Sequence, residues 1–346
     1  MSPYGAPQVP AVAALNTNEN PYSPSPALQK AITDAVAKVA VDLNRYPDRD
    51  ATILRTKLAT YINEGNGTSF TLDNIWAANG SNEIIQSIFL AFAQGAVLGF
   101  TPSYSMHPLI AKTTGAQWID GKRNADFSLN TTDAVSEILK SKPTLTFITT
   151  PNNPTGGAVT LAEIQKLADA AKDVGGLLVV DEAYAEFSQE VSAVTLIANN
   201  PHLIVIRTMS KAFAFAGARL GYLVSDVAVK DAMMIVRLPY HLSALTQAAA
   251  QVAIDHRAEL LGGVSTLIKA RGEVVQALHD MGLTTITSSA NFVLFTGFKQ
   301  DAPQLWAALL EKGVLIRDVG LSGYLRVTIG NEAENKLFVS ALKELI

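Results

Sequence analysis

Lys211 is the residue whose setting in this sequence most clearly indicates chemistry. It lies in RTMSKAFAFAGARLGY, residues 207–222, among small and apolar residues. Such surroundings disfavour an ammonium ion, so the neutral amine is available to attack a carbonyl carbon. Arg219, Thr208 and Ser210 accompany it, and a guanidinium group with hydroxyls is suited to hold a phosphate. Taken alone, the segment also fits a solvated loop lysine and an ordinary arginine at the start of a strand.

Two further segments place polar side chains directly after apolar runs. Asp181 lies in VVDEAYAEF, residues 179–187, and Asn153 lies in TTPNNPTGG, residues 149–157. Open parallel sheets bind ligands beyond the carboxyl ends of their strands, so we expect Asp181, Asn153 and Lys211 to share one pocket. Each segment also has a simpler interpretation, a helix cap for Asp181 and a tight turn for Asn153.

A helix start and an aromatic residue are expected to complete this pocket. Gly80, Ser81 and Asn82 precede an apolar helical stretch, and the free N–H groups at a helix start bind anions. Tyr104, in TPSYSMHP, follows an apolar run, where its ring is able to stack on a flat ligand. A capped helix and a core tyrosine are the simpler interpretations of these two features.

The composition limits the classes of protein to consider. The 346 residues carry a formal net charge of −4, 48% of them are apolar, 17% are charged and none is cysteine. These values exclude a disordered chain, and the absence of a Lys/Arg run argues against binding to nucleic acid. Without cysteine there is no disulfide or thiolate site, and we expect no metal. No apolar run approaches the roughly 18 residues of a membrane helix, so we expect a cytoplasmic protein that does not bind a membrane.

The order of elements predicts an α/β fold. Ser25 and Pro26 begin an amphipathic stretch over residues 27–40. Apolar runs then alternate with helical stretches, which is typical of a mainly parallel sheet between helices. Beyond residue 239 a long helical region, about 243–281, precedes NFVLF, GVLIRD and YLRVTIG, with a helix near 301–312. We therefore predict an N-terminal arm (1–22), a large domain (23–238) and a smaller C-terminal α/β domain (239–346).

The motifs together resemble those of a known family. PNNPTG, DEAY and SKAFxxAGxRxG occur here in the order and spacing found in fold type I pyridoxal-phosphate enzymes of the aspartate aminotransferase type. LNTNENPYSPSP, NRYPD, PSYSMH, RLPYHLS and YLRVTIG extend the resemblance along the chain, towards the histidinol-phosphate aminotransferases. The resemblance implies the fold type I architecture and a homodimer with shared active sites. A nucleotide-binding module without chemistry is the competing class, but neither of its glycine-rich phosphate motifs occurs.

The resemblance also implies roles for individual residues. Lys211 would bind pyridoxal 5'-phosphate as an imine and transfer protons, with Asp181 and Tyr184 as its catalytic partners. The cofactor-binding residues would be Ser81, Asn82, Tyr104, Asn153, Asp181, Tyr184, Thr208, Ser210, Lys211, Arg219 and the neighbouring subunit's Tyr46. The substrate-binding residues would be Tyr4, Asn20, Tyr240, Arg317 and Arg326.

The reaction that the resemblance implies is a transamination. Glutamate would donate its amino group to imidazole acetol phosphate, giving 2-oxoglutarate and histidinol phosphate. Two alternatives stay open at this point, an aromatic aminotransferase acting on phenylalanine and a decarboxylase acting on a phosphorylated amino acid. Arg317 and Arg326, together with NENP and RLPYHLS, favour the phosphorylated histidine precursor.

Overall fold

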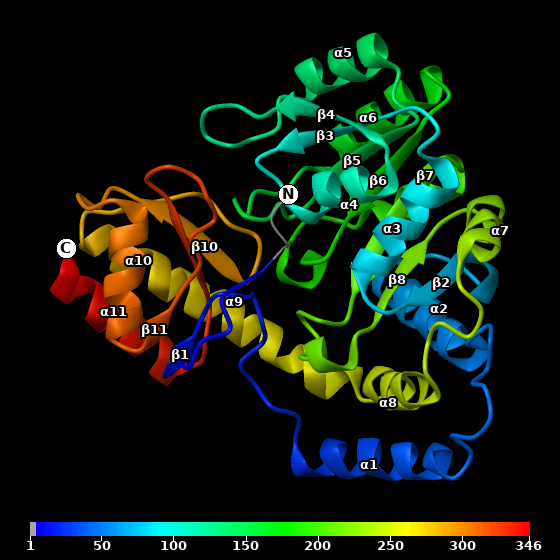
Figure 1. Cartoon of the computed structure of the whole chain (residues 1–346), viewed down its shortest axis with the longest axis horizontal. Coiled ribbons are helices and arrows are strands. Elements are labelled where there is room, and N and C mark those ends of the chain that lie inside the picture. The colour runs from blue at the N-terminus through cyan, green and yellow to red at the C-terminus, as the bar shows by residue number, and fades with distance from the viewer. Residues whose placement is uncertain (1–4) are drawn as a thin grey trace.

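The structure is a computed structural model that describes residues 5–346, and its centre is a seven-stranded sheet (Figure 1). The strand order is β2-β8-β7-β6-β5-β3-β4, and only β8 runs antiparallel to its neighbours. The mainly parallel sheet that the sequence predicts is therefore confirmed. The strands are β2 (Ile75–Ala78), β3 (Ala96–Thr101), β4 (Gln117–Lys122), β5 (Leu145–Thr149), β6 (Leu177–Asp181), β7 (Leu203–Thr208) and β8 (Gly221–Val224).

Helices cover both faces of this sheet because its central strands are apolar on both sides. Successive side chains of a strand point to opposite faces. Val180 of β6 accordingly belongs to one apolar cluster, and its neighbour Val179 to another. The helices of the Val179 face are α3 (Ser81–Phe92), α4 (Met106–Thr114) and α7 (Val227–Val236), and those of the Val180 face include α2 (Thr52–Asn66), α5 (Thr131–Ser141) and α6 (Leu161–Asp173).

The C-terminal part forms a smaller unit that incorporates the N-terminal arm. Its antiparallel sheet has the order β12-β10-β9, and β1 of the arm pairs in parallel with β11. The arm thus lies against the C-terminal part, as Figure 1 shows. The elements are β1 (Ala13–Ala14), β9 (Thr284–Thr285), β10 (Phe292–Thr296), α10 (Ala302–Glu311), β11 (Val314–Leu315), β12 (Leu325–Thr328) and α11 (Glu332–Leu345).

Helices link the two sheets. The helical region expected at 243–281 consists of two helices, α8 (Ala244–Asp255) and α9 (Arg257–Asp280), with a break at His256. Helix α8 packs on α1 (Pro26–Ala40) and α2, whereas α9 runs on to the C-terminal sheet. The start of α1 is confirmed, because the Ser25 hydroxyl accepts a hydrogen bond from the Leu28 amide. The domain boundary expected at residue 239 stays a prediction.

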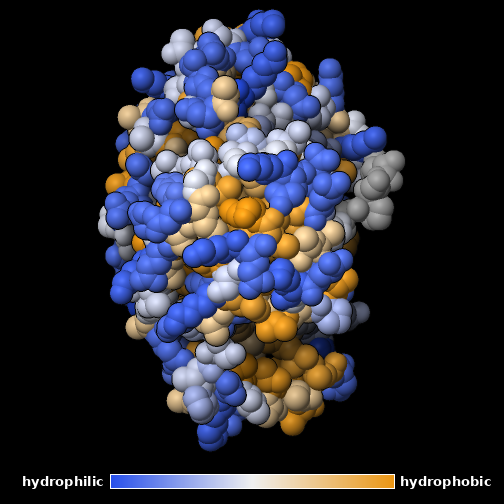
Figure 2. Space-filling model, turned by 90° about the vertical axis from the view of Figure 1, so that its left-hand side faces the viewer, coloured by the Kyte–Doolittle hydropathy of each residue, from blue (hydrophilic) through white to orange (hydrophobic). Residues whose placement is uncertain are grey.

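The surface is mixed in character. Figure 2 shows the side of the molecule that carries the C-terminal sheet, where hydrophilic residues predominate and hydrophobic residues gather near the centre and towards the lower end. Within residues 5–346, no helix combines the length and the apolar character that crossing a membrane requires.

A buried charge network joins β7 to the segment that follows β6. The Arg207 guanidinium lies 2.8 Å from the Glu182 carboxylate and 2.9 Å from the Glu186 carboxylate, and it also donates to the Ser192 hydroxyl. These acidic groups raise the pKa of Arg207 against the effect of burial, so it remains charged. Buried charges are stable only when each has its partner. The network therefore holds the Glu182–Glu186 turn in one position.

Glu182→Ala should lower the free energy of unfolding by about 3 kcal/mol, because it leaves a buried guanidinium without one of its two carboxylates. The control is Glu332→Ala, which removes the partner of Lys336 in an exposed ion pair. That change should cost no more than about 0.5 kcal/mol. Urea titration of both variants measures the difference, and equal losses would contradict the assigned role of the network.

Candidate active site

A cavity of about 320 Å³ lies at the carboxyl ends of β5, β6 and β7, beneath the N-terminal arm. This is where the sequence places the pocket, and side chains from distant parts of the chain meet there. The predicted site residues that line the cavity are Ser81, Asn82, Tyr104, Asn153, Asp181, Tyr184, Thr208, Ser210, Lys211, Arg219 and Arg326.

Lys211 follows the end of β7, and its amine points to the arm. The amine donates a hydrogen bond to the Thr17 carbonyl oxygen at 2.8 Å. Burial lowers the pKa of Lys211 to about 8, and the positive charges of Arg326 and Arg219 add to this effect while Glu19 opposes it. Near neutral pH a much larger fraction of Lys211 than of an ordinary lysine is therefore the uncharged, nucleophilic amine.

Asp181 ends β6 and is almost completely buried. One carboxylate oxygen accepts a hydrogen bond from the Ala183 amide, and the other lies 3.3 Å from Nε2 of His107. The His107 ring packs edge-on against Tyr104, with 5.5 Å between the ring centroids. Asp181 is thus held in place by a histidine that the sequence analysis did not assign. The segment PSYSMH, with His107 three residues after Tyr104, contains the signal that would have identified it.

The N-terminal arm forms one wall of the cavity. The Tyr184 hydroxyl accepts hydrogen bonds from Asn18 at 2.9 Å and from Asn153 at 3.5 Å. Arg326 donates to the Asn153 side chain at 2.5 Å and to the Asn16 carbonyl oxygen at 2.7 Å. The lining residues that the sequence analysis missed are Asn16, Thr17, Asn18, Glu19, Thr149, Ala183, Ala216 and Gly217. Most of them lie in or beside motifs of the sequence, but only the folded chain shows that they face the pocket.

The start of α3, with Ser210 and Arg219, forms a cup for an anion. Arg219 donates to the Ser210 hydroxyl at 3.4 Å, and a Cβ atom on Gly80 would lie 2.6 Å from the Arg219 guanidinium. A Cβ on Gly221 would lie 2.5 Å from the Ser81 amide nitrogen. Glycine at these positions lets the guanidinium group approach the N–H groups at the helix start. The guanidinium group and the N–H groups both direct positive charge into one small space, and this arrangement suits a phosphate.

Four predicted residues do not line this cavity. Tyr46 and Tyr240 stack on each other at the surface, Asn20 donates to the Ala212 carbonyl oxygen, and Arg317 donates to that of Gly5. Their proposed roles stay predictions. Tyr4 lies outside the described residues.

Comparison with known proteins agrees with this geometry. Residues 10–342 match the model of the family described as aminotransferase class I and II. This chain belongs to the class I and II aminotransferases. A curated relative from Mycobacterium sp. (strain JLS), named histidinol-phosphate aminotransferase, is 51% identical over an alignment of 348 positions that covers 100% of this aminotransferase and 92% of the relative. The resemblance stated from the motifs is confirmed.

Solved structures share the fold of this aminotransferase. The histidinol-phosphate aminotransferase of Clostridium acetobutylicum matches with a TM-score of 0.86 at 24% identity, over 96% of this chain and 99% of that one. The enzyme of the same name from Sinorhizobium meliloti, solved in complex with pyridoxal-5'-phosphate, matches with a TM-score of 0.84 at 24% identity, over 97% and 91% of the two chains. At 24% identity, the similarity to these two structures supports the fold alone. Class I and II aminotransferases depend on pyridoxal phosphate, so the expected cofactor is also confirmed.

The lowered pKa of Lys211 predicts a distinct pH profile in the cofactor-free protein. Reductive methylation of Lys211 should speed up as pH rises to about 8 and then level off, since only the neutral amine reacts. Ordinary lysines titrate near pH 10.4, so their rates keep rising. The exposed Lys269 serves as control in the same digest, read by mass spectrometry. Arg326→Gln should move the Lys211 profile to higher pH, and a Lys211 profile that follows Lys269 would refute the explanation.

The anion cup predicts that Gly80→Ala weakens binding of pyridoxal phosphate about tenfold or more, because the added carbon meets the Arg219 guanidinium. Gly67→Ala is the matched control. Gly67 also has a positive φ, 63°, but nothing lies within 4 Å of its Cβ position. Both variants should lose some stability through backbone strain, and only Gly80→Ala should lose affinity in a fluorescence titration with the cofactor.

Proposed function

We propose that this aminotransferase transfers the amino group of glutamate to imidazole acetol phosphate, giving 2-oxoglutarate and histidinol phosphate. The observation that carries the proposal is the 51% identity, over the whole chain, to a relative named for that substrate. A buried lysine of lowered pKa and a buried carboxylate that line the same cavity are consistent with it. The roles given below to single residues are parts of the same proposal.

The residues present fit the cofactor. Its phosphate would lie on the α3 start with Ser210 and Arg219, and its ring nitrogen would face Asp181. When bound, pyridoxal phosphate supplies an aldehyde that reacts with amines and a ring that accepts electrons from the substrate α carbon. Tyr104 lines the cavity and packs against His107, and its ring is able to stack on the cofactor.

The chain's own groups then divide the proton chemistry. The Lys211 amine would take the proton from the substrate α carbon and deliver it to the cofactor carbon that bears the aldehyde group. A group with a pKa near 8 is suited to this transfer at neutral pH. The Asp181 carboxylate, held in place by His107, would keep a proton on the ring nitrogen. Tyr184, whose hydroxyl accepts a hydrogen bond from Asn18, and Asn153 would offer hydrogen bonds to the ring's phenolic oxygen.

Arg326 is the proposed binding residue for the anionic group of each substrate. It is only 5% exposed, lines the cavity and is oriented by Asn153 and the Asn16 carbonyl oxygen. A guanidinium held in this way matches a carboxylate or phosphate better than a lysine would. Arg317, Tyr4, Asn20 and Tyr240 are further proposed contacts on the substrate side.

We also propose a homodimer in which Tyr46 reaches the cofactor phosphate of the second subunit. Tyr46 is 79% exposed and does not line the cavity of its own chain, so any contact it makes with a cofactor requires another copy. Ile53, Ile235 and Leu238 are large exposed apolar side chains of the neighbouring elements, and they support an interface on this side. A cytoplasmic location stays a prediction.

Steady-state kinetics with a substrate panel tests the substrate. We expect a higher kcat/KM for histidinol phosphate than for phenylalanine, and Arg326→Gln should lower kcat/KM for both substrates at least tenfold, because each presents an anionic group to this guanidinium. Glu332→Ala is a surface control. A kcat/KM for phenylalanine above that for histidinol phosphate would replace the proposal by the aromatic aminotransferase, and carbon dioxide release without transamination would replace it by the decarboxylase.

A further inference from the structure

Tyr46 and Tyr240 form an ordered aromatic pair on the outside of the chain. Their ring centroids are 4.4 Å apart and the rings are nearly parallel, at 18°. The two residues are nevertheless 79% and 40% exposed. Exposed aromatic side chains do not hold one arrangement unless the backbone beneath them is fixed. The segments that carry the pair, residues 46–51 and 237–241, therefore need a support.

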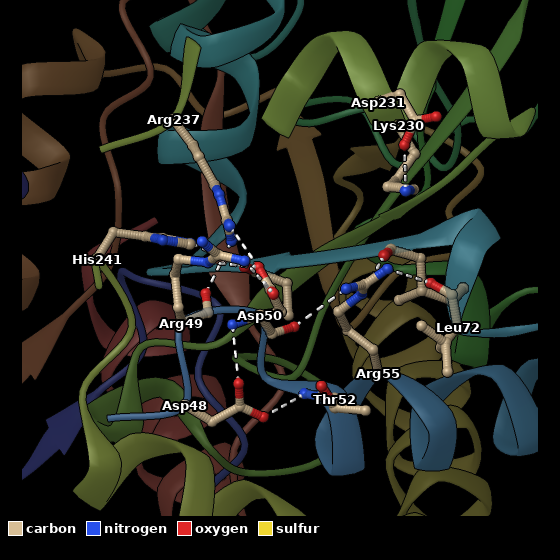
Figure 3. Close-up of polar contacts among 12 residues, drawn as sticks. Asp48, Arg49, Asp50, Thr52, Arg55, Leu72, Lys230, Asp231, Arg237 and His241 are labelled. Carbon is tan, nitrogen blue, oxygen red and sulfur yellow. Dashed lines mark hydrogen bonds and ion pairs between the residues drawn. The ribbon is translucent and has the colours of Figure 1, made fainter. Parts of the chain in front are cut away.

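Asp50 and Arg237 provide the bond between these two segments. Figure 3 shows Arg237 and Arg49 directed towards the Asp50 carboxylate. Arg237 lies 2.5 Å from one carboxylate oxygen of Asp50 and donates to the Arg49 carbonyl oxygen at 2.8 Å. The Arg49 side chain, through its hydrogen bond, and Arg237 lower the pKa of Asp50, so its charge persists in moderately acidic solution. The side chain of Arg237 is only 8% exposed, which strengthens the pair.

Arg55 and Asp48 attach the same loop to the rest of the chain. Arg55, 4% exposed, donates to the carbonyl oxygens of Asp50 and Ile75, which joins the loop to the edge strand β2 (Figure 3). The Asp48 carboxylate accepts from the amides of Asp50 and Thr52. The loop therefore has fixed contacts to the strand below it and to the helix that follows it.

The backbone on both sides of the ion pair is strained. Ala51 has φ = 46° and Tyr240 has φ = 55°, although neither is glycine. Left-handed backbone is rare for a bulky residue and costs on the order of 1–3 kcal/mol. Such conformations persist where surrounding contacts enforce them, and they are typical of functional sites. With this backbone conformation, the Tyr240 ring lies against Tyr46.

We propose that Asp50 and Arg237 are positioning residues, whose ion pair holds Tyr46 and Tyr240 as a preformed unit for the cofactor site of a second copy of this chain. The inference rests on the proposed shared-site dimer. Ordering a free loop on assembly costs backbone entropy for each residue fixed. A loop that is already fixed in the monomer avoids that entropy cost. The Tyr46 hydroxyl would then reach the cofactor phosphate of the second copy without further ordering of the loop.

A second route exists within one chain, and the test must separate the two. His241 accepts a hydrogen bond from Asn79 through its carbonyl oxygen and lies 3.0 Å from the Ala77 carbonyl oxygen through its ring. Asn79 directly precedes Gly80 and the anion cup. Loss of Arg237 could therefore act on the cofactor of its own chain through this connection.

The test uses Arg237→Gln in the intact enzyme. We expect about tenfold weaker binding of pyridoxal phosphate. Arg237→Lys should recover part of the affinity, because lysine keeps the positive charge but cannot bond the Asp50 carboxylate and the Arg49 carbonyl oxygen with the geometry of a guanidinium. Glu64→Gln is the matched control, since it removes the partner of Arg257 in an exposed ion pair. Unchanged affinity in Arg237→Gln would overturn the proposal.

Hybrid dimers decide which chain's site is affected. In a hybrid of one Arg237→Gln chain with one Lys211→Ala chain, the surviving site keeps its own Lys211 and receives an intact loop from its partner. We expect wild-type cofactor affinity there. In a hybrid of a wild-type chain with an Arg237→Gln/Lys211→Ala chain, the surviving site receives the altered loop, and we expect the full loss of affinity. The opposite pattern would overturn the proposal in favour of the route through His241.

Two further measurements keep the result interpretable. Hybrids built in the same way with Tyr46→Phe test the shared site itself. If Tyr46→Phe weakens cofactor binding in the site of its own chain, the proposed dimer function fails. If only Arg237→Gln acts on the site of its own chain, this inference fails and the proposed shared site stands. Should Arg237→Gln not fold, Asp50→Asn takes its place. The amide is nearly identical in shape but removes the charge, and wild-type cofactor affinity in that variant would equally refute the proposal.

Discussion

Enclosure of the Lys211 amine by the N-terminal arm is the interaction on which the rest of the site depends. The Thr17 carbonyl oxygen accepts from this amine, and the neighbouring Asn16 and Asn18 bond Arg326 and Tyr184. The arm is held in place by its pairing with β11. A lysine at the open end of a parallel sheet would be hydrated and charged without this cover. The arm therefore contributes to the reactivity of a residue almost two hundred positions away.

The large sheet and the small sheet meet at this enclosure. Asp181 and Lys211 come from the ends of neighbouring strands of the large sheet, whereas Arg326 comes from β12 of the small one. The charge of Arg326 lowers the pKa of Lys211, so a residue placed to bind substrate also tunes the residue that moves protons. Any shift of the C-terminal part relative to the large sheet would change both functions together.

Ion pairs hold two tyrosine-bearing segments of the chain in place, one beside the cavity and one at the surface. The Arg207 network fixes the turn that carries Tyr184, and the Asp50–Arg237 pair fixes the loop that carries Tyr46. In both places a guanidinium with few exposed atoms is bonded by groups that lie elsewhere along the chain. Such pairs add little to net stability compared with apolar packing, but they define one geometry.

The sequence by itself determined the order of strands and helices along the chain, the family and many of the residues that line the cavity, because apolar runs followed by Asp181, Asn153 and Lys211 are local patterns. It also identified the start of α1 from Ser25 and Pro26. Only the tertiary structure decided that residues 16–19 line the pocket, that His107 supports Asp181, and that Tyr46 stacks on Tyr240 outside it. These contacts join positions up to about three hundred residues apart, and no local pattern encodes which distant segments come together.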